Sequence, residues 1–259
     1  MSVNYGINLN KKKILIECRM TKELEKRGIS SFSEYLKLME DERSGELAGE
    51  LVNRLTTNYT YFFREPEHFK ILKEKILPEM YEKSFLPVWE FWCAGCSTGE
   101  ECYTLAMAVH EFLENAGKGP EVRILGTDVS ENVLEQARRG RYSLKEAEGI
   151  PALWRDKYCH KADGGFFVIE ERLRQMVRFR QQNLMQPVSQ RDKFALVMCR
   201  NVMIYFDRPA REKVVRNLEA SLAPGGYLFT GHAELLSQGE TVLNNRYPAV
   251  YQKKGGAER

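Results

Sequence analysis

The sequence predicts an α/β protein with a mainly parallel sheet domain, preceded by an all-helical domain and interrupted by a small antiparallel β-subdomain. From residue 88 onward, strand-like and helix-like segments alternate, which is typical of a parallel α/β sheet. The first 80 residues instead repeat apolar side chains at helical spacing. Residues 139–180 break the alternation with glycine turns and short β-rich runs. We therefore divide the chain into a helical domain (1–56), a linker with a linking helix (57–84), an α/β domain (85–253), an inserted β-subdomain (140–180) and a flexible tail (254–259).

Composition narrows the class of protein. The 259 residues, 43% of them hydrophobic, suffice for one large or two modest domains with a packed core. A net charge of +3 gives no reason to expect a nucleic-acid partner. No segment approaches the roughly 18 unbroken apolar residues of a membrane span, and the N-terminus lacks the apolar run of a signal peptide. We expect a cytoplasmic protein without membrane insertion. We also expect a monomer, although no motif specifies the oligomeric state.

Apolar spacing predicts the helices of the N-terminal part, at residues 12–26, 34–41, 46–55 and 68–83. Ser33 is the expected cap of the second helix. Pro66 suits the first turn of the fourth helix, and Pro78 should kink or interrupt that helix. The aromatic-rich segment 57–64 lies between the third and fourth predicted helices. On composition alone, we interpret it as a linker that its aromatic rings hold to the core.

Residues 88–101 predict a ligand cradle at the start of the α/β domain. Bulky β-formers lead into the small-residue loop GCSTG, and a helix over residues 101–115 follows. Glycines allow close backbone approach, and a helix start offers unpaired N–H groups. Glu100 and Glu101 at that start repel a pyrophosphate but favour a cationic ligand, so S-adenosylmethionine fits better than a dinucleotide. The alternative is an ordinary strand–turn–helix connection capped by Ser or Thr.

A second strand, residues 122–127, ends at Asp128, and Ser130 is the expected cap of helix 131–138. Ligands of parallel α/β sheets bind at the carboxyl ends of the strands, where an acid can accept hydrogen bonds from ribose hydroxyls. Asp128 lies 29 residues beyond Gly99, farther than the usual spacing of about 20, and the long first helix can absorb the difference. Alternatively, Asp128 only caps the next helix.

The insertion and the remaining strands complete the predicted sheet. Within the insertion, residues 166–169 and 176–179 have strand character, and the segment 138–180 carries a net charge of +5. This charge suits either docking of an acidic partner or a solvated surface. The alternation then resumes with the following elements: strand 194–199, helix 210–222, turn 223–226, strand 227–230 and a final strand at 247–253.

The cysteines and histidines give little indication of a metal or redox site. Cys93 and Cys96 have C-x-x-C spacing, but no second pair exists for zinc and no thioredoxin-like context surrounds them. We interpret them as small residues of a close-packed loop. The four histidines show no metal-ligand spacing, so we expect no metal; of the four, His232 follows a strand end and could approach the site.

Four strings together resemble one family, the bacterial chemotaxis receptor glutamate methyltransferases (CheR family), over about residues 10–253. The strings are TNYTYFFREP at 57–66, GCSTGEE at 95–101, CRNVMIYF at 199–206 and LAPGGYL at 222–228. The resemblance implies a Rossmann-like S-adenosylmethionine-dependent methyltransferase domain. It also implies methylation of glutamate carboxylates on the cytoplasmic domains of methyl-accepting chemotaxis receptors for sensory adaptation, with S-adenosylhomocysteine as the by-product.

Carried onto matching positions, the resemblance assigns roles to single residues. Arg64 and Tyr205 are expected to act in catalysis, by orienting the substrate carboxylate and by providing a hydrogen bond and an aromatic wall. Cofactor-binding residues are expected at Asn58, Thr60, Arg64, Gly95, Glu100, Asp128, Asn183, Leu184, Asn201 and Val202. The acceptor is already anionic at neutral pH, so we expect direct SN2-type transfer by alignment and desolvation.

Three other functions remain as alternatives: a methyltransferase of this fold with another substrate, a non-catalytic S-adenosylmethionine-binding signalling module, and an NAD oxidoreductase. Fold alone does not fix the substrate. The segment 158–179 is compact compared with relatives whose β-subdomain binds a receptor's C-terminal peptide, so we expect no such tether here.

Overall fold

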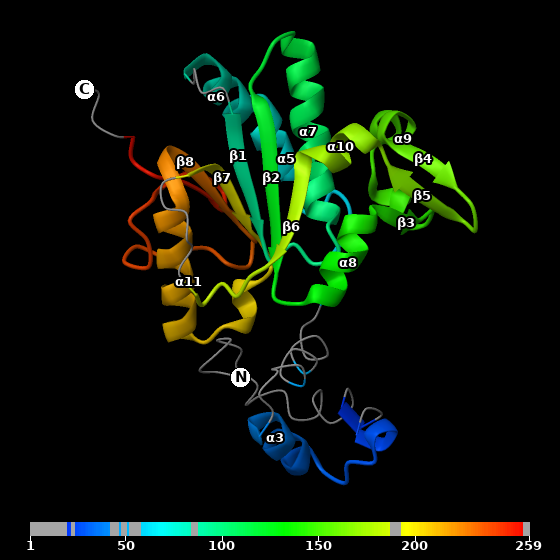
Figure 1. Ribbon diagram of the computed structural model, residues 1–259. Coiled ribbons are helices and arrows are strands. Elements are labelled where there is room, and N and C mark those ends of the chain that lie inside the picture. Colours follow the sequence, from blue (N-terminus) through cyan, green and yellow to red (C-terminus); the bar gives the residue numbers. More distant parts are fainter. Residues whose placement is uncertain are drawn as a thin grey trace.

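The computed structural model describes residues 20–21, 24–41, 47, 51, 58–83, 88–186 and 193–255. Within these ranges the α/β domain is built as the alternation predicts (Figure 1). None of the described helices has the length and apolar character that a membrane span requires. Apart from Leu47 and Leu51, the predicted helix at 46–55 lies outside the described residues, as do the start of the helix at 12–26, Thr57 and the tail beyond Gly255.

A seven-stranded sheet forms the centre of the α/β domain. Its order is β6-β2-β1-β7-β8-β10-β9. The first five strands run parallel, and β10 and β9 are antiparallel additions at one edge. The bounds are β1 Val88–Ala94, β2 Glu121–Asp128, β6 Val177–Gln181, β7 Phe194–Cys199, β8 Leu222–Thr230, β9 Asn244–Tyr247 and β10 Val250–Gln252.

Helices cover both faces of this sheet (Figure 1). Successive side chains of a strand point to opposite faces, so Phe91 and Cys93 of β1 pack in one core while Trp92 and Ala94 pack in the other. The first core lies under α5 Pro66–Ile71 and α7 Glu100–Ala116, and the second lies under α11 Arg208–Ser221. This two-sided burial explains why β1 is an unbroken apolar run near its carboxyl end.

The inserted subdomain is smaller than predicted. Its antiparallel sheet, in the order β3-β5-β4, contains β3 Arg141–Ser143, β4 Cys159–Ala162 and β5 Phe166–Ile169. The prediction that residues 176–179 form a strand of the insertion was wrong in its placement. After α10 Glu171–Met176, β6 pairs in parallel with β2 and becomes the edge of the main sheet. Strand character is a local property, whereas the choice of pairing partner depends on the tertiary fold.

The linking helix is continuous, but its geometry changes before Pro78. A π-helical turn at Leu72–Ile76 joins α5 to α6 Leu77–Lys83, and the Leu77 N–H donates to the Leu72 carbonyl. A proline ring would collide with the carbonyl four residues earlier in a regular α-helix. The wider turn absorbs this conflict at the place where the sequence predicted a kink.

Two local details differ from the expected ones. Helix α3, Phe32–Asp41, is capped by Ser31 and not by Ser33, since the Glu34 N–H donates to Ser31 Oγ at 3.1 Å. The predicted last strand at 247–253 is instead part of a hairpin of β9 and β10, which turns at Ala249 with φ 56°.

Candidate functional site

A cavity opens where β1, β2 and β7 end and the linker before α5 crosses them. It contains about 1070 Å³ of space, counted out to its open mouth. Because β2 and β7 lie on opposite sides of β1, this is the switch point where α/β sheets bind ligands. All predicted site residues except Glu100 line it: Asn58, Thr60, Arg64, Gly95, Asp128, Asn183, Leu184, Asn201, Val202 and Tyr205.

A tight turn after β1 forms the floor of the cavity. The N–H groups of Gly95 and Cys96 both donate to the Thr127 carbonyl at 2.8 Å, which ties the turn to β2. Gly95 has φ 82°, and a Cβ added there would lie 2.4 Å from Val202 Cγ2. Only glycine permits this approach, so the cradle predicted from the small-residue loop requires Gly95.

Asp128 stands at the carboxyl end of β2. Its Oδ2 accepts from the Ser97 N–H at 2.9 Å, and its Oδ1 accepts from the Ser130 N–H at 3.0 Å. Ser130 itself is the cap of α8 Glu131–Arg139, as predicted. Burial raises the pKa of Asp128, while the backbone N–H groups oppose the rise. Asp128 therefore holds the β1 loop and faces the cavity, a larger role than capping a helix.

The linker is fixed to the α/β domain by both rings and polar groups. Phe62 is fully buried and packs edge-on against Tyr142, with ring centroids 4.9 Å apart. The Phe63 N–H donates to Thr104 Oγ1 at 3.3 Å, and Ser97 Oγ donates to the Asn58 carbonyl at 2.9 Å. The aromatic attachment that composition suggested is present, and it presents the polar linker residues to the cavity.

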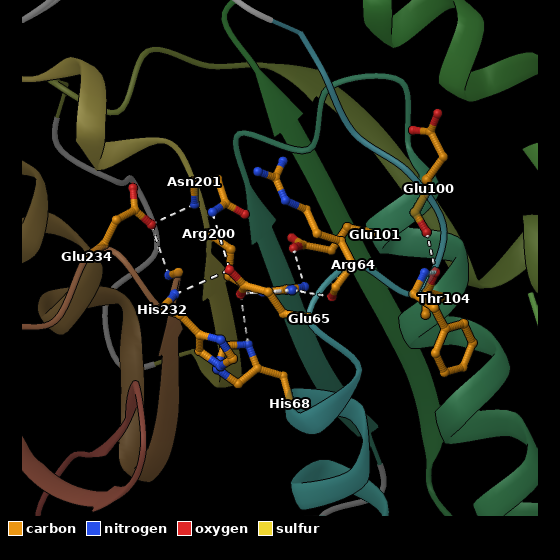
Figure 2. A network of polar contacts seen from close by, with 12 residues as sticks. Arg64, Glu65, His68, Glu100, Glu101, Thr104, Arg200, Asn201, His232 and Glu234 are labelled. Atoms are coloured by element: carbon orange, nitrogen blue, oxygen red, sulfur yellow. Dashed lines mark hydrogen bonds and ion pairs between the residues drawn. The ribbon is translucent and has the colours of Figure 1, made fainter. Parts of the chain in front are cut away.

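Buried charges join the linker to β7 and α7 (Figure 2). Arg200, whose side chain is 1% exposed, contacts Glu65 Oε2 at 3.1 Å and Glu101 Oε2 at 2.9 Å, and it also donates to the Arg64 carbonyl. Burial opposes ionisation of Glu65, but the hydrogen bond with His68 and the charge of Arg200 outweigh it, so the pKa of Glu65 is well below its usual value. We call Glu65, Glu101 and Arg200 the ion network.

The two glutamates at the start of α7 have different surroundings. Glu101 lines the cavity, whereas Glu100, which the sequence placed there, does not. Glu100 is 2% exposed and accepts from Thr98 Oγ1 at 2.7 Å. Burial raises the pKa of Glu100 to about 7. Successive residues of a helix point about 100° apart, so adjacent acids cannot both face one cavity.

Glu234 organises the opposite wall. This fully buried carboxylate accepts from the Asn201 N–H at 2.6 Å (Figure 2). It also accepts from the N–H groups of Ile204 at 3.0 Å and Gly231 at 2.9 Å. It thereby holds Asn201 in a left-handed conformation, φ 59°. The Oδ1 of Asn201 is buried and has no hydrogen-bond partner among the described residues.

Strained backbone gathers at this site. Among the described residues, five non-glycine residues have positive φ, and four of them border the cavity or belong to the ion network: Phe63 (61°), Glu65 (55°), Ser97 (49°) and Asn201 (59°). Such conformations cost about 1–3 kcal/mol each and concentrate at functional sites. Their clustering here marks the cavity independently of its shape.

Sequence reasoning assigned no role to Glu65, Arg200 or Glu234, and it considered Glu101 only as one of two acids at a helix start. Arg200 stood in the string CRNVMIYF, but its carboxylate partners lie 135 and 99 residues away in the chain.

The interpretation of the cysteines as packing residues agrees with their environment. Cys93 and Cys96 are free and buried, and burial raises the pKa of Cys93 to about 11.

Comparison with known families gives consistent results along the chain. Residues 2–56 match the family model described as the CheR methyltransferase all-alpha domain, and residues 58–250 match the CheR methyltransferase SAM binding domain. A chemotaxis protein methyltransferase of Borreliella burgdorferi is 40% identical over 96% of this chain and 90% of its own. Chemotaxis protein methyltransferase 1 of Pseudomonas aeruginosa is 34% identical over 87% of this chain and 83% of its own.

Chemotaxis protein methyltransferase 1 of Vibrio cholerae is 35% identical over 92% of this chain and 86% of its own. With both domain models matched and relatives above 30% identity along most of their length, the chain belongs to the CheR family of S-adenosylmethionine-dependent chemotaxis methyltransferases.

Proposed function

We propose that this protein transfers a methyl group from S-adenosylmethionine to glutamate side chains of the cytoplasmic domains of methyl-accepting chemotaxis receptors, giving glutamate methyl esters. The observation that carries the proposal is a single cavity lined both by Asp128 at a strand end and by Arg64 and Tyr205 from the linker and the β7 loop. Asp128 can accept hydrogen bonds from the ribose hydroxyls of the donor, and Arg64 can pair with an anionic acceptor.

The residues present fit the donor. Asp128 keeps lone pairs for ribose hydroxyls, because the Ser97 and Ser130 N–H groups leave part of the acceptor capacity of its carboxylate unused. The buried Oδ1 of Asn201, which has no hydrogen-bond partner in the described part of the chain, offers an acceptor for an N–H or O–H of the ligand. Of the two glutamates at the start of α7, Glu101, which pairs with Arg200, is the one that lines the cavity. We therefore assign a contact with the donor's amino group to Glu101, in place of the cofactor-binding role expected of Glu100.

Arg64 is proposed to orient the acceptor carboxylate. One of its Nη atoms donates to the Tyr59 carbonyl at 2.9 Å, and its guanidinium lies 5.7 Å from the Tyr61 ring centroid. A guanidinium has five N–H donors, so donors remain for a substrate oxygen. Tyr205 lines the same cavity and is proposed to add a hydrogen bond and an aromatic wall.

The reaction needs alignment more than proton transfer. The bound donor supplies a methyl carbon that its sulfonium already activates. A glutamate carboxylate has a pKa near 4.3 and is anionic at neutral pH, so no general base is required. The chain's contribution is to hold the carboxylate in line and to exclude water that would solvate it. The buried attachment of the linker through Phe62 serves that exclusion.

Receptor docking is proposed for the helical domain, residues 1–56, and for the basic insertion. The insertion presents Arg141 on β3, where its guanidinium carbon lies 4.1 Å from the Phe166 ring centroid and one of its Nη atoms donates to the Asp163 carbonyl at 2.7 Å. The neighbouring β4–β5 hairpin turns through Asp163, Gly164 and Gly165 alone. We propose that docking uses the basic surface directly, without a receptor C-terminal tether.

The test is methyl transfer from labelled donor to purified receptor cytoplasmic fragments, with release of methanol in mild alkali as the readout for an ester. We expect labelling of the receptor that is lost when its acceptor glutamates are changed to alanine. Arg64→Ala should lower kcat/KM for the receptor by at least ten-fold, while Arg208→Ala, at an 87% exposed side chain, should leave it unchanged. Binding of S-adenosylhomocysteine without receptor labelling, or an alkali-stable product, would overturn the proposal.

A further inference from the structure

Three potential metal ligands converge next to the ion network. They are Glu65 in the linker, His68 on α5, and His232 in the loop after β8 (Figure 2). None of the three lines the cavity. Each offers one ligand atom, and these atoms all lie within 4.8 Å of one another. The two imidazole centroids are 4.6 Å apart.

His68 is the unusual member of this cluster. Its side chain is 0% exposed, yet its Nε2 has no hydrogen-bond partner among the described residues. Its Nδ1 lies 3.3 Å from Glu65 Oε2, a contact that a neutral ring can make with an N–H on Nδ1. A neutral ring keeps a lone pair on one nitrogen, and buried polar atoms of this kind normally have a partner.

We propose that Glu65, His68 and His232 form a binding site for a divalent transition metal ion of the zinc class. Imidazole nitrogens and a carboxylate oxygen are the ligands that such ions prefer. His232 and Glu65 are accessible enough to admit an ion, since His232 is exposed and the Glu65 side chain is 15% exposed. Three protein ligands leave further positions of the ion to water, as is usual for an open site.

The site is coupled to the ion network through Glu65. Arg200 Nη2 and Nε lie 3.1 and 3.2 Å from Glu65 Oε2, the same oxygen that faces His68. A metal ion here competes with Arg200 for Glu65 and repels its guanidinium. Arg200 also holds the Arg64 carbonyl and Glu101, which border the cavity. An occupied metal site should therefore weaken binding of S-adenosylhomocysteine, and by linkage the ligand should weaken metal binding by the same factor.

The experiment is titration of the full chain with Zn²⁺ in a non-coordinating buffer, followed by calorimetry, and with Co²⁺, followed by visible absorption. Wild type should bind one ion, and His232→Ala should weaken binding at least ten-fold. His160→Ala is the matched control, because His160 pairs with Glu170 on the surface and should bind as wild type does. The Co²⁺ spectrum should lack the near-ultraviolet thiolate band, which separates this site from the cysteines.

The proposal is overturned if wild type binds no ion, if His232→Ala binds as tightly as wild type, or if the Co²⁺ spectrum shows thiolate ligands. His68→Gln can be added where circular dichroism shows that it folds, and it should also lose the ion. The coupling is tested by titrating S-adenosylhomocysteine with and without saturating Zn²⁺, where at least a three-fold weakening is expected. The two proposals can fail separately. The protein can methylate the receptor without binding a metal ion, and it can bind a metal ion without methylating the receptor.

Discussion

The two sides of the cavity are built in different ways. On the side of β1 and β2, backbone N–H groups make the contacts: those of Ser97 and Ser130 reach the Asp128 carboxylate, and that of Gly95 reaches β2. On the side of the linker, side-chain charges make them: Arg200 joins Glu65 and Glu101. The first arrangement follows from strands ending at one edge of a sheet. The second exists only once segments far apart in the chain have packed together.

This difference predicts that the linker side is the more vulnerable to single substitutions. Losing one member of a buried ion pair leaves an uncompensated charge, whereas losing a carboxylate that accepts backbone N–H groups leaves neutral donors. Substitutions at Arg200, Glu100, Asp128 and Ser130 test that contrast.

The largest effect is expected for Arg200→Ala. Two partly buried carboxylates, Glu65 and Glu101, lose their shared cation, so the free energy of unfolding should fall by about 3–5 kcal/mol. Urea denaturation followed by circular dichroism measures this. Arg208→Ala, the surface control with an 87% exposed side chain, should stay within about 0.5 kcal/mol of wild type. A loss below about 1 kcal/mol for Arg200→Ala would remove the contrast between the two sides.

Glu100 should give the folded protein a specific pH dependence. Burial raises the pKa of its carboxyl from 4.5 to about 7, so the folded state holds the proton more tightly than the unfolded chain. Its contribution to stability therefore falls as pH rises from about 4.5 through 7. Glu100→Gln removes this dependence, so the variant should exceed wild type by roughly 3 kcal/mol at pH 8. The two should agree at pH 4.5. Denaturation curves across this range measure the difference, and a constant offset would contradict the assignment.

Asp128→Ala tests the strand side through ligand affinity. Removing a charged acceptor of hydrogen bonds should weaken S-adenosylhomocysteine binding by about 1.5–3 kcal/mol, or roughly 10–100-fold. Titration calorimetry provides the measurement, and Asp163→Ala in the exposed hairpin is the control. Equal affinity in the two variants would show that Asp128 serves only to hold the Ser97 and Ser130 N–H groups.

The smallest effect is expected for Ser130→Ala. The hydroxyl caps α8 by accepting from the Val133 N–H at 3.5 Å, and loss of such a cap costs about 1 kcal/mol. Thermal unfolding should show the loss, and Ser130→Thr, which keeps the hydroxyl, should restore most of it. A loss as large as that for Arg200→Ala would mean that the strand side is no more tolerant than the linker side.

The same contrast explains what the sequence could and could not predict. Gly95 and Asp128 were placed correctly in one cavity because each follows a strand of a parallel sheet, and strand ends share an edge. Arg200 and Glu234 were missed because their partners are fixed by packing, not by spacing. The resemblance assigned a cofactor contact to Glu100, because the sequence alone does not show which of the two adjacent glutamates at the start of α7 faces the cavity. The strand at 176–179 was recognised, but its pairing with β2 was not.

The left-handed residues Phe63, Glu65, Ser97 and Asn201 have a consequence for laboratory evolution. Each would be relieved by glycine, which adopts positive φ without penalty. At Glu65 this gain is smaller than the loss, because glycine would leave Arg200 without one of its two carboxylates. At Asn201 glycine would remove an amide that faces the cavity and whose Oδ1 has no hydrogen-bond partner among the described residues. A population selected for heat resistance alone should therefore replace Asn201 first, whereas selection for methyl transfer should keep it.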